Sequence, residues 1–220
     1  LGMYTIASEF ARLPSTELSA PINRAVFPGL ARLAGDRVAL VRVFTDVMGM
    51  TFALTLPASI GLALVAGPLV DVVLGSQWRE SAPLLAVLAV SGAIEVIAAN
   101  NGIVYLAIGK THLGAALSAV KLGLLILLAA VLVPRLGVMG MALSELTAST
   151  LAIIVSCIVL MRVVKLPLSG LVAAMWRPIL ASAVMGAVLV SMVGSPLAPA
   201  AEPGTARLLL GSISMGAVTY

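Results

Sequence analysis

Long runs of apolar residues, separated by short polar stretches, dominate the chain. Seven such runs can be distinguished, and most approach the roughly 20 residues that a helix needs to cross a bilayer. The runs are continuous and lack the alternation of membrane β-barrel strands. The expected spans cover residues 1–32, 46–66, 84–108, 113–133, 138–161 and 176–193, with a seventh from about 207. The pattern predicts an all-α integral membrane protein, a bundle of about seven transmembrane helices.

Prolines and polar stretches subdivide this pattern. Three prolines interrupt the first run and Pro57 lies in the second, so both helices should be kinked. Residues 36–44 and 168–175 have the amphipathic character of segments that lie in the membrane interface. The stretch 67–83 reads as a polar connection between spans, and residues 134–137 end the fourth span.

Composition excludes an ordinary soluble domain. The chain is 61% hydrophobic and 10% charged, and its mean hydropathy is +1.16. A soluble domain has about a quarter of its residues charged, which it needs to cover its core. The net charge of +4 mostly reflects the Lys and Arg residues that set the orientation of a membrane protein. It gives no reason to expect a nucleic-acid partner.

The basic residues of the short loops predict an orientation. Eight fall on one side of the membrane and three on the other, with the remaining two of the thirteen inside spans. The eight are Arg24, Arg32, Arg37, Arg42, Lys110, Arg162, Lys165 and Arg177. Because Lys and Arg concentrate on the cytoplasmic side, the loops after the first, third and fifth spans should be cytoplasmic.

Both ends of the chain lie in apolar stretches. Leu1 opens inside one and Tyr220 closes inside another, so we expect a piece of a longer protein.

The most informative residues are polar ones inside the expected spans. They are Glu9, Arg12, Glu95, Asn100, Asn101, Lys121 and Glu145. Lys121 should lie about 12 Å into its span and Glu95 about 16 Å into its own, at 1.5 Å per residue. A charge near the bilayer centre costs roughly 2.5–3.5 kcal/mol, so it normally meets a cavity or a partner.

Each of these residues has a structural alternative to a functional role. Lys121 and Glu95 can form an ion pair between neighbouring spans, or mark a substrate or proton path. Asn100 and Asn101 suit interhelical hydrogen bonding as well as they suit cavity lining. Glu145, about two turns from the outer end of its span, favours a solvated or capping role.

Glu9 and Arg12 stand three apart on one helix face, where they can neutralise each other. Arg12 would keep donors for an anionic ligand. The loops carry no catalytic constellation or metal-binding motif, which disfavours an enzyme.

Four stretches carry a family resemblance. They are NRAVFPGLARLAGD (23–36), PASIGLALVAGPLVDVVLGSQW (57–78), YLAIGK (105–110) and PRLGVMGMALS (134–144). In order and spacing they resemble the second half of polysaccharide flippases. These are the Wzx-type O-antigen and exopolysaccharide exporters of the multidrug/oligosaccharidyl-lipid/polysaccharide exporter superfamily.

The resemblance implies a transporter of 12–14 helices in two lobes, of which this chain is most of the C-terminal lobe. Residues 1–161 would be the six-helix lobe, incomplete at its start, and 162–220 additional, truncated helices. The implied activity is translocation of undecaprenyl-diphosphate-linked oligosaccharide across the bacterial inner membrane by alternating access. The implied partners are this substrate, membrane lipid, and polysaccharide polymerase and chain-length regulator proteins. No cofactor and no metal are implied.

In that family the cavity is cationic, which suggests roles for the polar residues. By physical position, Arg12, Arg24 and Lys121 would bind substrate, and Asn100 and Asn101 would line the cavity. Glu9, Glu95 and Glu145 would serve in charge pairing or in coupling.

Three other interpretations stay open. A cation-coupled multidrug antiporter of the same superfamily would carry acidic groups in its cavity. A membrane polysaccharide polymerase or ligase would need a large loop, and this sequence has none. A structural scaffold would have no evident use for Lys121 and Glu95 inside the membrane.

Overall fold

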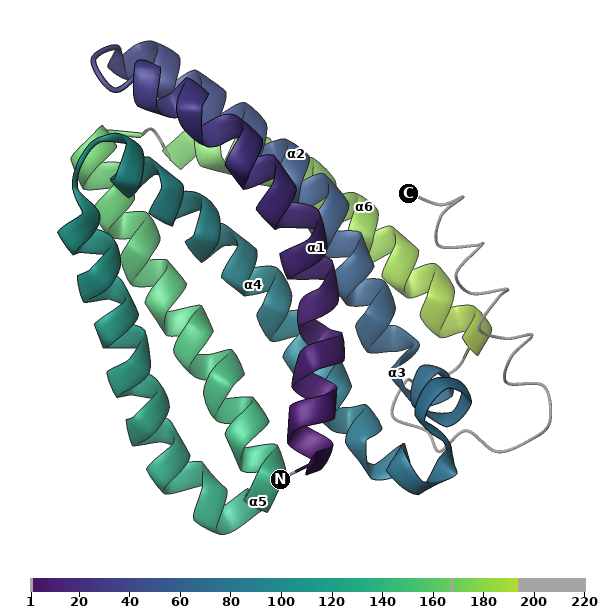
Figure 1. The fold of residues 1–220 in the computed structure, drawn as a ribbon. Helices are drawn as coiled ribbons and strands as arrows, with labels where there is room; N and C mark the ends of the chain where they lie inside the picture. Colours follow the sequence, from purple (N-terminus) through teal and green to yellow (C-terminus); the bar gives the residue numbers. More distant parts are fainter. Residues whose placement is uncertain (1, 167, 194–220) are drawn as a thin grey trace.

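The computed structural model describes residues 2–166 and 168–193, and over these ranges the chain is a bundle of long helices (Figure 1). Within these ranges, four helices are long and apolar enough to cross a membrane by length and composition. The elements are α1 (Gly2–Arg32), α2 (Arg37–Leu64), α3 (Ala66–Leu69), a π-helical turn η1 (Val70–Leu74), a 3₁₀ turn η2 (Ser76–Ser81), α4 (Ala82–Ala107), α5 (Thr111–Val164) and α6 (Leu168–Val193). The predicted all-α membrane fold is confirmed.

Helix α5 is two membrane-length arms joined by a reversal at Gly137. The backbone there has φ 59° and ψ −135°, a conformation that only glycine adopts readily. Gly140 then lies directly against the backbone of Leu132, so the second arm runs back along the first. The arms fall on either side of residues 134–137, where the sequence predicts a break between two spans.

Helix α1 is bent and packs along α4. It contains Pro14, Pro21 and Pro28, each of which removes a backbone donor from the helical ladder. The two helices approach closely at Gly92, where a Cβ would stand 3.1 Å from the carbonyl oxygen of Ala11. Buried residues Ala7 and Ala11 belong to the same contact, and small residues of this kind let membrane helices approach.

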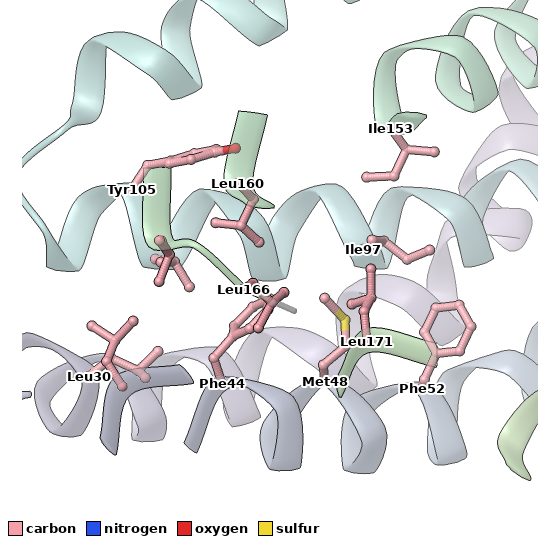
Figure 2. Close-up of a cluster of buried hydrophobic side chains, with 13 residues drawn as sticks. Leu30, Phe44, Met48, Phe52, Ile97, Tyr105, Ile153, Leu160, Leu166 and Leu171 are labelled. Atoms are coloured by element: carbon pink, nitrogen blue, oxygen red, sulfur yellow. The ribbon is translucent and has the colours of Figure 1, made fainter. Parts of the chain in front are cut away.

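A second hydrophobic cluster joins the other half of the bundle (Figure 2). Phe44, Met48 and Phe52 project from α2 toward Ile97 and Tyr105 of α4, and residues of α5 and α6 complete it. Helix α6 packs closely on α2, with Ala174 against Gly49 and Gly186 against Ile60. In lipid such contacts stabilise through close packing, because the hydrophobic effect between helices is absent.

The three loops predicted to be cytoplasmic lie at one end of the bundle (Figure 1). Arg37, at the start of α2, donates from Nε to the Val164 carbonyl oxygen at 2.6 Å and from Nη2 to that of Lys165 at 3.3 Å. These bonds satisfy carbonyls that the end of α5 would otherwise leave without partners. They also tie the α1–α2 loop to the α5–α6 connection.

Some predicted boundaries are wrong. Residues 36–44 are no separate interfacial segment but the beginning of α2, capped by the Asp36 carboxylate, which accepts from Ala39 N–H at 3.1 Å. Residues 168–175 likewise continue into α6, and 67–83 forms short helical turns. Residues 37–44 and 168–175 thus belong to the same continuous helices as the apolar residues that follow them. The predicted seventh span and the connection before it lie outside the described residues, and the division at 161/162 stays a prediction.

Candidate functional site

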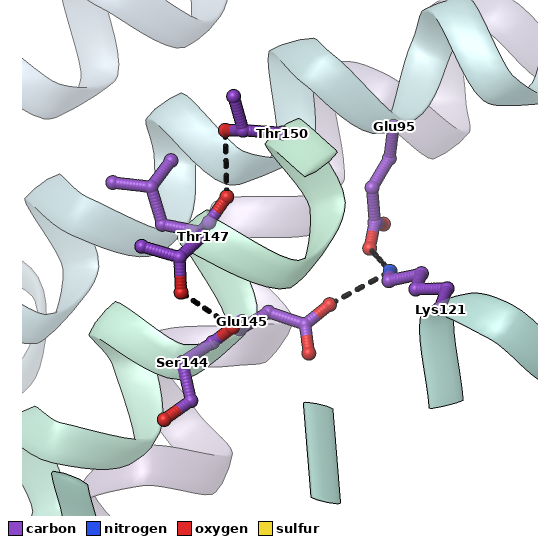
Figure 3. A network of polar contacts seen from close by, with 7 residues as sticks. Glu95, Lys121, Ser144, Glu145, Thr147 and Thr150 are labelled. Carbon is purple, nitrogen blue, oxygen red and sulfur yellow. Dashed lines mark hydrogen bonds and ion pairs between the residues drawn. The ribbon is translucent and has the colours of Figure 1, made fainter. Parts of the chain in front are cut away.

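Three charged side chains meet where α4 and the two arms of α5 pack together (Figure 3). Lys121 Nζ lies 2.5 Å from Glu95 Oε1 and 2.8 Å from Glu145 Oε1. The reversal at Gly137 is what places Lys121 and Glu145, on opposite arms, within reach of each other. The predicted Lys121–Glu95 pair is therefore present, and it has a third member.

This ion cluster, defined as Glu95, Lys121 and Glu145, is partly withdrawn from solvent. The side chain of Glu145 is 9% exposed, and those of Lys121 and Glu95 are each 29% exposed. The expectation that Glu145 is solvated or caps a helix end is wrong, because the fold-back of α5 buries it against Lys121. With all three groups ionised, the cluster carries one more negative than positive charge.

Arg12 borders the ion cluster without pairing with it. It shares a small cavity with Tyr4, Ser8, Ser91, Glu95 and Glu145, at the junction of α1, α4 and α5. Arg12 is exposed, and within residues 2–166 and 168–193 its guanidinium forms no ion pair. The predicted neutralisation by Glu9 is therefore absent, although Glu9 is also exposed on α1. Arg12 keeps all its donors.

A larger cavity of about 320 Å³ lies between α4 and the arms of α5. Glu95 and Lys121 line it, and its polar lining also includes Tyr105, Thr111, Ser118, Ser149 and Ser156. The Ser149 side chain is buried and its hydroxyl has no hydrogen-bond partner among the described residues. The remaining lining is aliphatic, with small residues at Ala98, Gly102, Gly114, Ala115 and Ala152.

Asn100 and Asn101 act as interhelical contacts in this structure. Asn101 Nδ2 donates to Ser156 Oγ of α5 at 3.0 Å, and Asn100 Nδ2 donates to Met48 Sδ of α2 at 3.5 Å. Both side chains are buried, and neither lines the two cavities described above. The geometry favours the hydrogen-bonding alternative for both residues.

Arg24 is not brought to the ion cluster. It is exposed on α1 and lines neither cavity. Twelve residues of helix separate it from Arg12, a rise of about 18 Å. It lies nearer the end of α1 that meets the basic loops.

The hydroxyl side chains that line the larger cavity were not predicted from the sequence, although their spacing relative to Glu145 could have indicated them. Ser149 and Ser156 follow Glu145 by four and eleven residues, which places all three on one face of the second arm of α5. Within the described part of the chain, His, Cys, Asp and Glu residues form no group of three or more that could hold a metal ion.

Comparisons with known proteins agree with one another. Residues 1–83 match a family described as polysaccharide biosynthesis protein. The whole chain is 29% identical to the teichuronic acid biosynthesis protein TuaB of Bacillus subtilis, covering 45% of it. Over 73% of its length the chain is 25% identical to the lipopolysaccharide biosynthesis protein WzxC of Escherichia coli, covering 33% of that protein. The chain thus spans less than half the length of these relatives.

The fold has a counterpart among solved structures. The inward closed conformation of the lipid II flippase MurJ superimposes on 99% of this chain with a TM-score of 0.75, using 46% of its own length. The two sequences are 18% identical, so this likeness concerns the fold. The chain is thus similar in sequence to polysaccharide biosynthesis proteins of the Wzx type, and its fold is that of half of a flippase of known structure.

Proposed function

We propose that this chain forms part of a flippase that moves lipid-linked oligosaccharide units across a membrane for polysaccharide synthesis. Relatives named for teichuronic acid and lipopolysaccharide biosynthesis support the substrate class, and the MurJ fold supports the flippase class. The observation that carries the proposal is the cluster of Glu95, Lys121 and Glu145 among membrane-length helices, bordered by the unpaired Arg12. Ionisable groups are retained at such positions chiefly for transport.

Arg12 is the residue that we assign to the anionic part of the substrate. Arg12 is an exposed residue whose guanidinium forms no ion pair within the described ranges, and the planar fork of that group matches phosphate oxygens in a bidentate way. Lys121 is different, because two carboxylates already neutralise it. We therefore assign Lys121 to holding α4 and the two arms of α5 in register, and Arg24 to substrate attraction near the basic end of the bundle.

The proposed setting is the cytoplasmic membrane of a bacterium, with the loops after α1, α4 and α5 in the cytoplasm. These loops carry the excess of Lys and Arg that the positive-inside rule associates with that side. The proposed mechanism is alternating access by two lobes, and the proposed role is transport without catalysis. A polysaccharide polymerase and a chain-length regulator are the partners that such a pathway would supply.

Deleting the complete gene should block the pathway at the translocation step. We expect undecaprenyl-linked repeat units to accumulate on the cytoplasmic side while surface polysaccharide is lost, because assembly continues when export stops. Extraction and quantification of lipid-linked oligosaccharides measures this. When the deletion strain carries an Arg12→Ala copy of the gene, we expect surface polysaccharide to stay absent although the variant protein is inserted in the membrane. Unchanged lipid-linked glycan, together with altered resistance to cationic drugs, would indicate the antiporter instead.

A further inference from the structure

The ion cluster is short of one positive charge. Lys121 contacts both Glu95 and Glu145, so a single ammonium group faces two carboxylates. Water can compensate only partly, because the Glu145 side chain is 9% exposed. An uncompensated charge among membrane-spanning helices is costly, and such groups normally acquire a partner. The cluster therefore attracts a further cation.

Arg12 is placed to be that cation. It lines the same small cavity as both carboxylates, and this cavity, with a volume of about 10 Å³, leaves a gap near the size of one water molecule. Ser91, 2% exposed, contributes a hydroxyl to this cavity that has no partner among the described residues. Arg12 thus stands at the edge of a polar gap that a small displacement of α1 would close.

The local structure of α1 permits such a displacement. Pro14 removes a ladder hydrogen bond two residues after Arg12. The hydroxyls of Ser15 and Thr16 both donate to the Arg12 carbonyl oxygen, at 2.8 and 2.9 Å, a pattern that bends helices. One residue before Arg12, Ala11 rests on Gly92 of α4. The backbone hydrogen bonding of α1 is thus weakened on the C-terminal side of Arg12, while on the N-terminal side the helix is in close contact with α4.

We infer that Arg12 exchanges between two partners: the carboxylates of Glu95 and Glu145, which it reaches when a displacement of α1 closes the small cavity, and the diphosphate of the lipid-linked substrate. This inference rests on the proposed function. The carboxylates compete with substrate for one guanidinium, so they weaken binding and promote release. Each exchange also changes the bend of α1, which links occupancy of the site to the conformation of the bundle.

A double-mutant cycle in the complete protein tests the competition. The probe is undecaprenyl diphosphate, added to purified protein in detergent, with uncharged undecaprenol as the reference for chain binding. Glu145→Gln leaves Lys121 paired with Glu95 and removes a carboxylate that competes with substrate for Arg12, so we expect the Kd for the diphosphate to fall about three- to tenfold. In an Arg12→Gln background, where binding is already weaker, the same change should leave Kd unaltered.

The control is Glu17→Gln, which removes an exposed carboxylate of α1 and should leave Kd unchanged. An equal effect of Glu145→Gln in both backgrounds would indicate simple charge repulsion and overturn the competition, as would no effect in either. If Glu145→Gln does not fold, Glu95→Gln provides the same cycle with Lys121 held by Glu145. Failure of the wild-type protein to bind the diphosphate, with intact fold, would instead overturn the proposed function.

Discussion

Replacing Lys121 with methionine is expected to produce the largest loss of stability of any single charge removal in this chain. The substitution leaves Glu95 and Glu145 facing each other without a cation, at a position where Glu145 is 9% exposed. Breaking a buried ion pair from one side costs roughly 3–5 kcal/mol, and the 29% exposure of Lys121 points to the lower end of that range. Denaturation of the complete protein in detergent measures the free energy of unfolding.

The matched control is Lys110→Met, which removes an exposed ammonium group from the turn between α4 and α5. It should change the free energy of unfolding by less than about 0.5 kcal/mol. A triple variant, Lys121→Met with Glu95→Gln and Glu145→Gln, should recover most of the stability, because no unpaired charge is left. Equal stability of the Lys121→Met and Lys110→Met proteins would show that the ion cluster contributes nothing to the fold.

Gly140→Ala is expected to disrupt the reversal of α5. A Cβ at this position would stand 2.6 Å from the carbonyl carbon of Leu132 and 2.9 Å from the nitrogen of Val133. Both are backbone atoms, so the arms must separate, at a cost of roughly 1–3 kcal/mol for overpacking. Separation also draws Lys121 away from Glu145, and transport should fall together with stability. Thermal denaturation and surface polysaccharide level are the two measurements.

Gly123→Ala on the first arm of α5 is the control for this prediction. Its Cβ would meet no atom within 4 Å, and alanine is the better helix former by roughly 0.8–1 kcal/mol. This variant should be as stable as wild type or more stable. A Gly140→Ala protein with wild-type stability would contradict the close contact between the arms.

The sequence predicts much of the helical layout because long apolar runs must be helical in lipid. The expected span 84–108 corresponds to α4 at Ala82–Ala107, and the break expected at 134–137 contains the reversal at Gly137. The hydropathy pattern gives a wrong prediction for 36–44 and 168–175, which begin helices α2 and α6. An amphipathic segment in the interface and the polar end of a spanning helix have the same composition, so the pattern does not distinguish them.

The site was harder to predict, because its geometry depends on the relative register of helices. The pairing of Lys121 with Glu95 is one of the alternatives that the sequence predicts, because each charge lies well inside one of two neighbouring spans. The third member, Glu145, reaches Lys121 because the arms of α5 lie in contact, which local pattern cannot specify. The surroundings of Arg12 were hard to predict for the same reason, because its neighbours across the small cavity come from α4 and α5.

The most direct test of the account is translocation by the complete protein in proteoliposomes. A lipid-linked oligosaccharide placed in one leaflet should become accessible to a glycosidase on the opposite side, and the Arg12→Ala protein should not support this movement. Translocation by wild type and its loss in Arg12→Ala is the predicted result. Absence of translocation by wild-type protein that is inserted and folded, or undiminished translocation by Arg12→Ala, would contradict it.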